Sequence, residues 1–99
     1  MWREEIPYGT QISSDCRYLE ENPREQTIIL AIFEMIVQDR PISEIAATLN
    51  QRGFVTRDGA DWTASAVFNL LPRLIEVGQR TLATREWAEI RRGLMRRAS

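Results

Sequence analysis

The sequence predicts a small α+β domain with a helix-turn-helix-like helical core, an N-terminal β-hairpin and a second β-hairpin that forms a wing. Apolar residues recur at helical spacing in several segments between residues 23 and 97. Turn-forming clusters, "SSD" at residues 13–15 and "RDG" at residues 57–59, indicate two tight hairpins. The chain has 99 residues, enough for one modest core.

The first predicted element is the N-terminal hairpin in "IPYGTQISSDCRYLEE", residues 6–21. Pro7 and Gly9 open this segment, and the Ser/Asp cluster in its middle is typical of a turn. We therefore expect strands near residues 10–13 and 17–20.

The segment "NPREQ" predicts a helix start. Asn22 is a suitable N-cap, Pro23 fits the first helical position, and Glu25 lies three residues after the cap. Apolar residues then recur at helical spacing at Ile29, Ile32, Phe33 and Ile36. We expect this helix, about residues 23–38, to form part of the core.

A second helix is expected after Pro41, which breaks the pattern of the first. Ser43 is the predicted N-cap, and Gly53 is the predicted end of the helix. The expected buried face consists of Ile45, Ala46 and Leu49.

The wing is predicted from "FVTRDGADW", which suggests two short β segments around Asp58 and Gly59. This dipeptide tolerates the positive φ angles of a tight hairpin turn. Residues 53–62 separate the two helices, whereas the usual helix-turn-helix connection is about three or four residues. Trp62 is expected to pack on the helices, because an indole ring buries a large apolar area.

A third helix is predicted to begin after Thr63, its N-cap. The expected inward stripe is Val67, Leu70, Leu71 and Leu74. The expected outward face is Ser65, Phe68, Asn69, Pro72 and Arg73. Pro72 should end or kink the helix, because its ring clashes with the carbonyl four residues earlier. Gly78 is then expected in the connection that follows.

A last helix is expected over about residues 82–97, and it carries much of the positive charge. Its apolar side would hold Trp87, Ile90 and Leu94. The rest of its surface would carry Arg85, Arg91, Arg92, Arg96 and Arg97. Residues 1–78 contain seven arginines and twelve acidic residues, whereas residues 79–99 contain six arginines and two acidic residues.

Composition excludes several classes of protein. The N-terminus lacks the layout of a signal peptide, and no apolar run approaches the roughly 20 residues of a membrane helix. We therefore expect a cytoplasmic protein that does not bind membranes. Cys16 is the single cysteine, and the chain has no histidine, so the common zinc sites cannot be assembled. We expect no metal and no cofactor.

The order of these elements resembles the DNA-binding "recombinase" domain of large serine recombinases, in the site-specific recombinase/resolvase family. The similar features are "IPYG", the Asn-Pro helix start, the "IAATLNQRG" helix, the "TRDGADW" hairpin, the leucine pair and a closing glycine, over residues 6 to about 80. In that family the domain lies between a catalytic domain and a zinc-ribbon domain. The resemblance implies a DNA-binding domain, which we place at residues 1–80. The charge and apolar pattern predicts that a basic amphipathic C-terminal helix follows it at residues 81–99.

The resemblance and the residue chemistry together suggest how double-stranded DNA would be bound. A recognition helix points its first residues at base edges and its amide dipole at phosphate. Asparagine pairs with adenine, and arginine pairs with guanine or phosphate. The DNA-contact candidates are Arg57, Thr63, Ser65, Asn69, Arg73, Arg80, Arg91 and Arg92.

The role expected from the resemblance is non-catalytic: an accessory factor, a repressor or a mobile-element remnant. In this family the nucleophilic serine precedes the Pro-x-Gly motif, and only residues 1–6 precede Pro7 here. The serines present in this chain have no histidine to activate them, so we expect no catalytic residue.

An alternative function is also open. Phe68 and Pro72 stand where the family commonly has arginine or other polar residues, and an exposed apolar patch is typical of a protein contact. The chain would then form a homodimer or bind a protein partner through Phe68 and the C-terminal helix.

Overall fold

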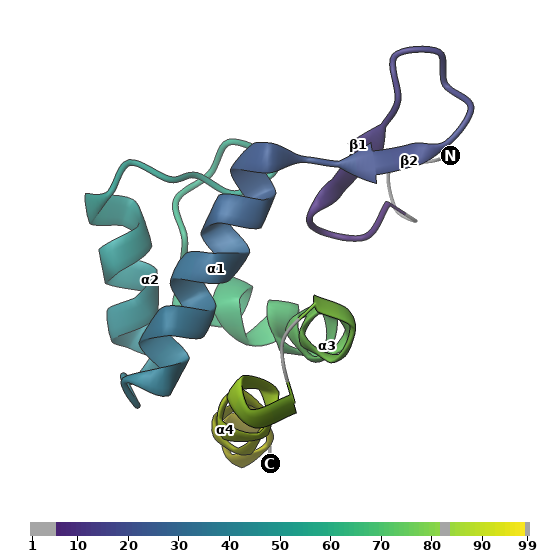
Figure 1. Ribbon diagram of the computed structural model, residues 1–99. Coiled ribbons are helices and arrows are strands. Elements are labelled where there is room, and N and C mark those ends of the chain that lie inside the picture. Colours follow the sequence, from purple (N-terminus) through teal and green to yellow (C-terminus); the bar gives the residue numbers. More distant parts are fainter. Residues whose placement is uncertain (1–5, 82–83, 99) are drawn as a thin grey trace.

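A computed structural model describes residues 6–81 and 84–98 of the chain and confirms the α+β class (Figure 1). The elements in chain order are β1 (Thr10–Ile12), β2 (Leu19–Glu21), α1 (Pro23–Val37), α2 (Ile42–Gln51), α3 (Ala64–Thr81) and α4 (Thr84–Ala98). The two strands form the predicted antiparallel hairpin, with Gln11 opposite Glu20. This hairpin projects from the N-terminal end of α1 (Figure 1).

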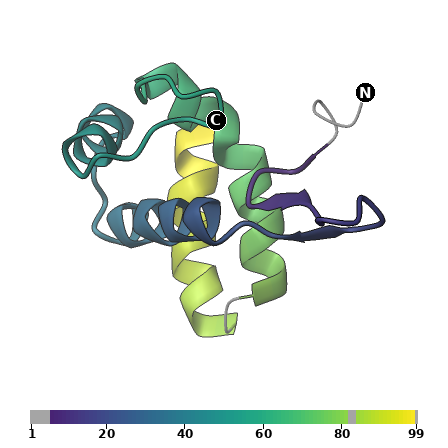
Figure 2. The same cartoon turned by 90° about the horizontal axis from the view of Figure 1, so that it is seen from above.

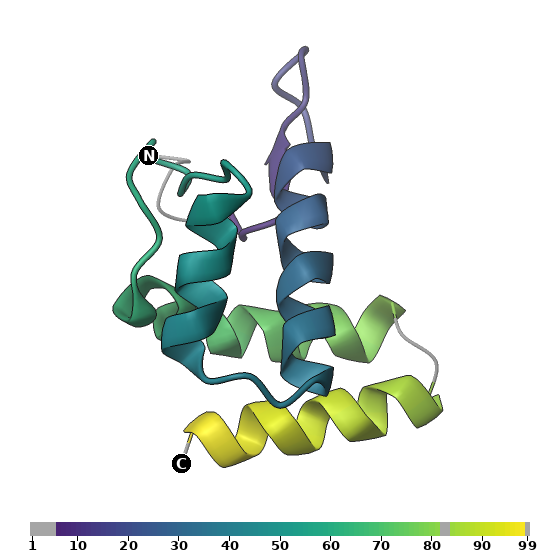
Figure 3. The ribbon, with the colours of Figure 1, turned by 90° about the vertical axis from the view of Figure 1, so that its left-hand side faces the viewer.

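The helices form two layers, with α1 and α2 on one side and α3 and α4 on the other. Figure 2 shows α1 crossing over α3 and α4, which lie side by side, and Figure 3 shows α1 and α2 standing on this pair. All four helices contribute to one core, which includes Ile32, Leu49, Leu74 and Leu94, each fully buried. The basic C-terminal helix that was predicted from the sequence is therefore packed into the domain.

The start of α1 confirms the predicted cap. Asn22 Oδ1 accepts a hydrogen bond from the Glu25 amide at 3.1 Å, and Pro23 occupies the first turn. The predicted apolar face is buried, with Ile29, Ile32, Phe33 and Ile36 all in the core.

The predicted cap of α2 is wrong. Pro41 is the N-cap residue and Ser43 lies within the first turn, with no side-chain hydrogen bond at the cap. Pro41 has extended backbone angles, and its carbonyl accepts from the amides of Glu44 and Ile45, each at 3.0 Å. The helix therefore begins two residues earlier than a cap at Ser43 would allow. Gly53, at φ +82°, follows the end of the helix as predicted.

The predicted β-hairpin wing is also wrong. Residues 54–62 are all described and contain no β-strand. They form a loop around a tight turn, in which Thr56 N donates to Ala60 O at 2.8 Å and Gly59 N donates to Thr56 O at 2.9 Å. Gly59 has the expected positive φ of +83°. The two ends of the loop bond α2 and not each other: Phe54 N donates to Leu49 O at 3.0 Å, and Asn50 bonds the main chain of Trp62.

Trp62 shows how this loop is attached to the helices. Its side chain is 5 % exposed and lies in the core, as predicted. Its main chain pairs with the Asn50 amide at the end of α2: Asn50 Nδ2 donates to Trp62 O, and Trp62 N donates to Asn50 Oδ1, both at 2.8 Å.

We expect Asn50→Ala to lower the free energy of unfolding by about 1 kcal/mol, because it leaves both Trp62 main-chain groups without their partner. Urea unfolding followed by tryptophan fluorescence measures this change. Gln51→Ala is the matched control, because Gln51 is exposed and adjacent. Equal stabilities of the two variants would show that this pair of hydrogen bonds does not hold the loop.

The third helix is longer than predicted. Thr63 caps it as expected, because Thr63 Oγ1 accepts from the Ala66 amide at 3.1 Å. The helix then continues past Pro72 to Thr81, so the expected end at Pro72 is wrong. Pro72 deprives the Phe68 carbonyl of its helical donor. Both residues are exposed, and this carbonyl therefore lies on the solvent side of the helix.

Gly78 lies inside α3 and not in a connection, which corrects another expectation. It is buried where α3 meets α4, and a Cβ atom at this position would overlap the Trp87 ring. The glycine therefore allows the Trp87 indole to lie directly on the α3 backbone.

Candidate nucleic-acid interface

The first half of α3 has an exposed polar and apolar face opposite its buried stripe. Val67, Leu71 and Leu74 point into the core, as the spacing predicts. The exposed residues are Thr63, Ser65, Phe68, Asn69 and Pro72. The predicted outward face is therefore confirmed for every member except Arg73.

Arg73 does not lie freely on that outward face. Its side chain is 14 % exposed, and Arg73 Nε donates to the Tyr8 carbonyl at 2.8 Å. Its Nη1 also bonds the Glu76 carboxylate at 2.6 Å. The helical pattern places Arg73 near the edge of the stripe, but the carbonyl that draws it inward is 65 residues away in sequence.

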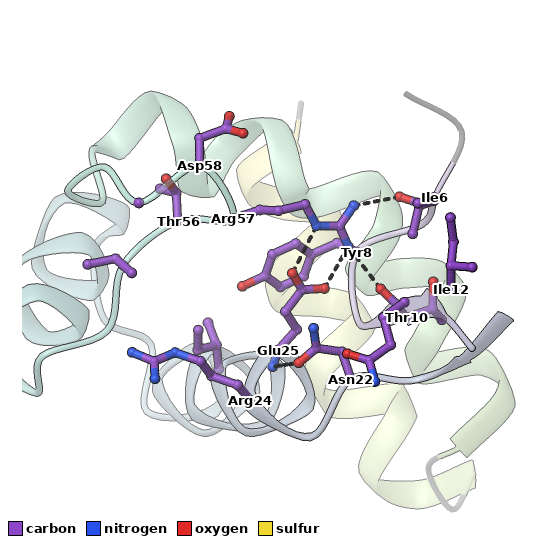
Figure 4. Close-up of a pocket in the computed structure, with 14 residues that line it drawn as sticks. Ile6, Tyr8, Thr10, Ile12, Asn22, Arg24, Glu25, Thr56, Arg57 and Asp58 are labelled. Atoms are coloured by element: carbon purple, nitrogen blue, oxygen red, sulfur yellow. Dashed lines mark hydrogen bonds and ion pairs between the residues drawn. The ribbon is translucent and has the colours of Figure 1, made fainter. Parts of the chain in front are cut away.

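Arg57, the candidate from the loop, is held by several groups at once (Figure 4). It forms a two-pronged ion pair with Glu25, with Nε to Oε2 at 2.8 Å and Nη2 to Oε1 at 2.6 Å. It also donates to the main-chain carbonyls of Ile6, Pro7 and Thr10, and its guanidinium lies 5.4 Å from the centre of the Tyr8 ring. The hydrogen bonds to Glu25 raise the pKa of Arg57.

Glu25 is the central acceptor of this cluster, and the sequence did not indicate that role. Its position three residues after Asn22 suggested a local capping function. The carboxylate instead accepts from the Gly9 amide at 2.8 Å and from Arg57, and the residue is only 6 % exposed. Burial raises the pKa of the neighbouring Tyr8 phenol above its usual range, and the charge of Glu25 adds to this shift.

Together these contacts attach residues 6–10 to the helical domain. Arg57, Arg73 and Glu25 bind the main chain of this segment, and Gln26 Nε2 donates to the Gly9 carbonyl at 2.9 Å. Contacts of Arg57 or Arg73 with DNA would need their guanidinium groups to give up these partners. The DNA roles of both residues stay predictions.

The remaining basic candidates are exposed on α3 and α4. Arg80, Arg91 and Arg92 are all exposed, and within the described part of the chain none of them has an ion-pair partner. Arg96 Nη2 bonds Asp39 at 2.8 Å, and the Arg97 side chain lies outside the described residues. Figures 2 and 3 show the C-terminal end of α4 beside the first half of α3. Arg91 and Arg92 lie in the middle of α4, and α4 is in direct contact with α3.

A comparison with models of protein families shows to which family this chain belongs. The model described as Recombinase matches residues 23–97, which is most of the chain. The chain belongs to the Recombinase family. This Recombinase match begins at the start of α1 and includes all four helices, whereas the sequence resemblance was placed over residues 6 to about 80. Searches of curated proteins and of solved structures found no match.

The described residues of this Recombinase-family domain contain neither a membrane-spanning helix nor a cluster of metal-ligating side chains. No described helix is long and apolar enough to cross a membrane. Among residues 6–81 and 84–98, no group of three or more His, Cys, Asp or Glu residues is placed to hold a metal ion.

Proposed function

We propose that this Recombinase-family domain binds double-stranded DNA as a non-catalytic module, such as an accessory factor or repressor related to recombination. One observation carries the proposal most directly. The exposed residues in the first half of α3 and the exposed arginines Arg91 and Arg92 belong to two helices, α3 and α4, that lie side by side. A helix with an exposed N-terminal half and cations on the neighbouring helix is an arrangement that suits major-groove recognition.

In the proposed complex, the first half of α3 enters the major groove. Thr63 and Ser65 lie at the N-terminus of the helix, where backbone amides and the helix dipole favour a phosphate. Asn69 faces the base edges, and Arg91 and Arg92 neutralise phosphates beside the groove. The chain as a whole has a formal charge of −1, so attraction to DNA depends on this local group of arginines.

The test is binding to a random-sequence duplex at several salt concentrations. We expect Arg91→Gln/Arg92→Gln to weaken binding about tenfold at low salt and to reduce the slope of log K against log salt by about 2, because each lost phosphate contact contributes about 0.9. Fluorescence anisotropy with a labelled duplex measures both quantities.

The matched control is Arg17→Gln/Arg24→Gln, which removes the same charge from exposed positions at the hairpin and the start of α1. Equal effects of the two double variants would assign the binding to net charge alone and remove α4 from the interface. Absence of salt-dependent binding by the wild-type domain would refute the proposal.

A second candidate function rests on Phe68, whose side chain is 46 % exposed. A large exposed aromatic residue beside Pro72 would also suit a protein contact or a homodimer, with α4 contributing to the surface. Light scattering on the free domain distinguishes the two functions. A stable dimer with no affinity for DNA at low salt would favour the protein contact.

A further inference from the structure

The exposed face of α3 has a composition that restricts which bases it can recognise. Four exposed residues of α3 lie on this face at helical spacings of three, one and three. They are Ser65, Phe68, Asn69 and Pro72. None of them carries a charge. The face therefore offers one hydroxyl, one amide, one aromatic ring and one pyrrolidine ring to a groove.

Asn69 is the hydrogen-bonding group of this face. Among the described residues, its side-chain amide makes no hydrogen bond, so both its donor and its acceptor are available. An asparagine amide matches the N6 donor and N7 acceptor of adenine in the major groove. It does not match guanine, which presents two acceptors there.

Phe68 is the apolar group next to it. Its exposed ring would be costly to leave in water and gains nothing from a phosphate. The thymine C5-methyl group is the apolar feature of the major groove, and aromatic or aliphatic side chains contact it there. The adjacent positions of Phe68 and Asn69 thus favour the two bases of A·T pairs.

Arginine is the side chain of this protein that would select guanine, and no free arginine lies on this face among the described residues. α3 contains two basic residues, Arg73 and Arg80. Arg73 is bound to Tyr8 and Glu76. Arg80 is 11 residues beyond Asn69, which corresponds to roughly 16 Å along a helix.

We infer that the exposed face of α3 recognises A·T base pairs, with Asn69 bonding adenine and Phe68 packing on the thymine methyl group. This inference rests on the proposed DNA-binding function and specifies its target. The salt-dependent contacts of Arg91 and Arg92 would supply affinity, and the uncharged face of α3 would supply the base preference.

The experiment compares three duplexes of equal length: alternating dA·dT, alternating dG·dC, and the dA·dT duplex with deoxyuridine replacing thymidine. Deoxyuridine removes only the C5-methyl group. The wild-type domain should bind the dA·dT duplex at least about fivefold more tightly than dG·dC. It should bind the deoxyuridine duplex about threefold more weakly than dA·dT, since one methyl contact is lost.

The variants assign each preference to one side chain. Phe68→Ala should bind the thymidine and deoxyuridine duplexes equally, and Asn69→Ala should lose most of the preference for dA·dT over dG·dC. Gln79→Ala, at an exposed position further along α3, is the control and should retain both preferences. Circular dichroism of each variant verifies that it is folded.

The outcomes separate this inference from the proposed function. Equal binding to all three duplexes, a preference for dG·dC, or a methyl effect that persists in Phe68→Ala would overturn the A·T assignment and leave DNA binding intact. A preference that persists in Asn69→Ala would also overturn it, because the preference would then come from duplex shape. Failure to bind any duplex at low salt would refute both the A·T assignment and the proposed DNA-binding function.

Discussion

Arg57→Ala is expected to lower the free energy of unfolding by about 3 kcal/mol, because it leaves the buried carboxylate of Glu25 without its cation. The Glu25 side chain is 8 % exposed, so water cannot readily replace the guanidinium. The same substitution removes the hydrogen bonds from Arg57 to the carbonyls of Ile6, Pro7 and Thr10. Urea or thermal unfolding measures the loss.

A double-mutant cycle tests whether the ion pair is the cause. Arg57→Met/Glu25→Gln should be more stable than the sum of the two single variants predicts, because removing both partners leaves no buried unpaired charge. Arg17→Ala, in the exposed turn between β1 and β2, should change stability by less than about 0.5 kcal/mol. Additive single effects would show that Arg57 acts through its other contacts.

The elements that the sequence predicts well are those governed by local rules. The α1 start was predictable because an asparagine cap, a first-turn proline and a regular apolar stripe all lie within one segment. The inward stripe of α3 was predictable for the same reason, since the helical period alone separates Val67, Leu71 and Leu74 from the exposed residues. These rules also placed Ser65, Phe68 and Asn69 correctly on the surface.

The features that the sequence did not predict depend on groups that are distant in the chain. In isolation, Arg57 is an arginine in a polar turn, and its partner Glu25 is 32 residues away. Arg73 turns toward a carbonyl of the N-terminal segment for which no local pattern gives a signal. The loop at residues 54–62 has the composition of a hairpin, yet its two ends bond α2, Phe54 through Leu49 and Trp62 through Asn50, and not each other.

The continuation of α3 past Pro72 has a related cause. A helix rule applied to sequence alone counts the cost of a missing hydrogen bond, about 3 kcal/mol in a helix interior. In the folded domain the Phe68 carbonyl that loses its partner faces solvent, where water can bond it. The burial of Leu74 and Val77 beyond the proline favours continued helix.

The contact between α3 and α4 leads to the second large expected effect. Gly78→Ala should lower the free energy of unfolding by about 2 kcal/mol, because the added methyl group overlaps the Trp87 ring and forces the two helices apart. In a helix without this contact, the same substitution would raise stability by about 0.5–1 kcal/mol. The sign of the change therefore distinguishes close packing from an ordinary helical position.

Two further variants show where the effect originates. Gln79→Ala is the matched control, because Gln79 is the next residue of α3 and is exposed. The free energy of unfolding of this variant should stay close to that of the wild type. Trp87→Leu provides a smaller side chain at the contact, and in that background Gly78→Ala should cost less than it does alone. If Gly78→Ala stabilises the domain, the indole does not lie against α3.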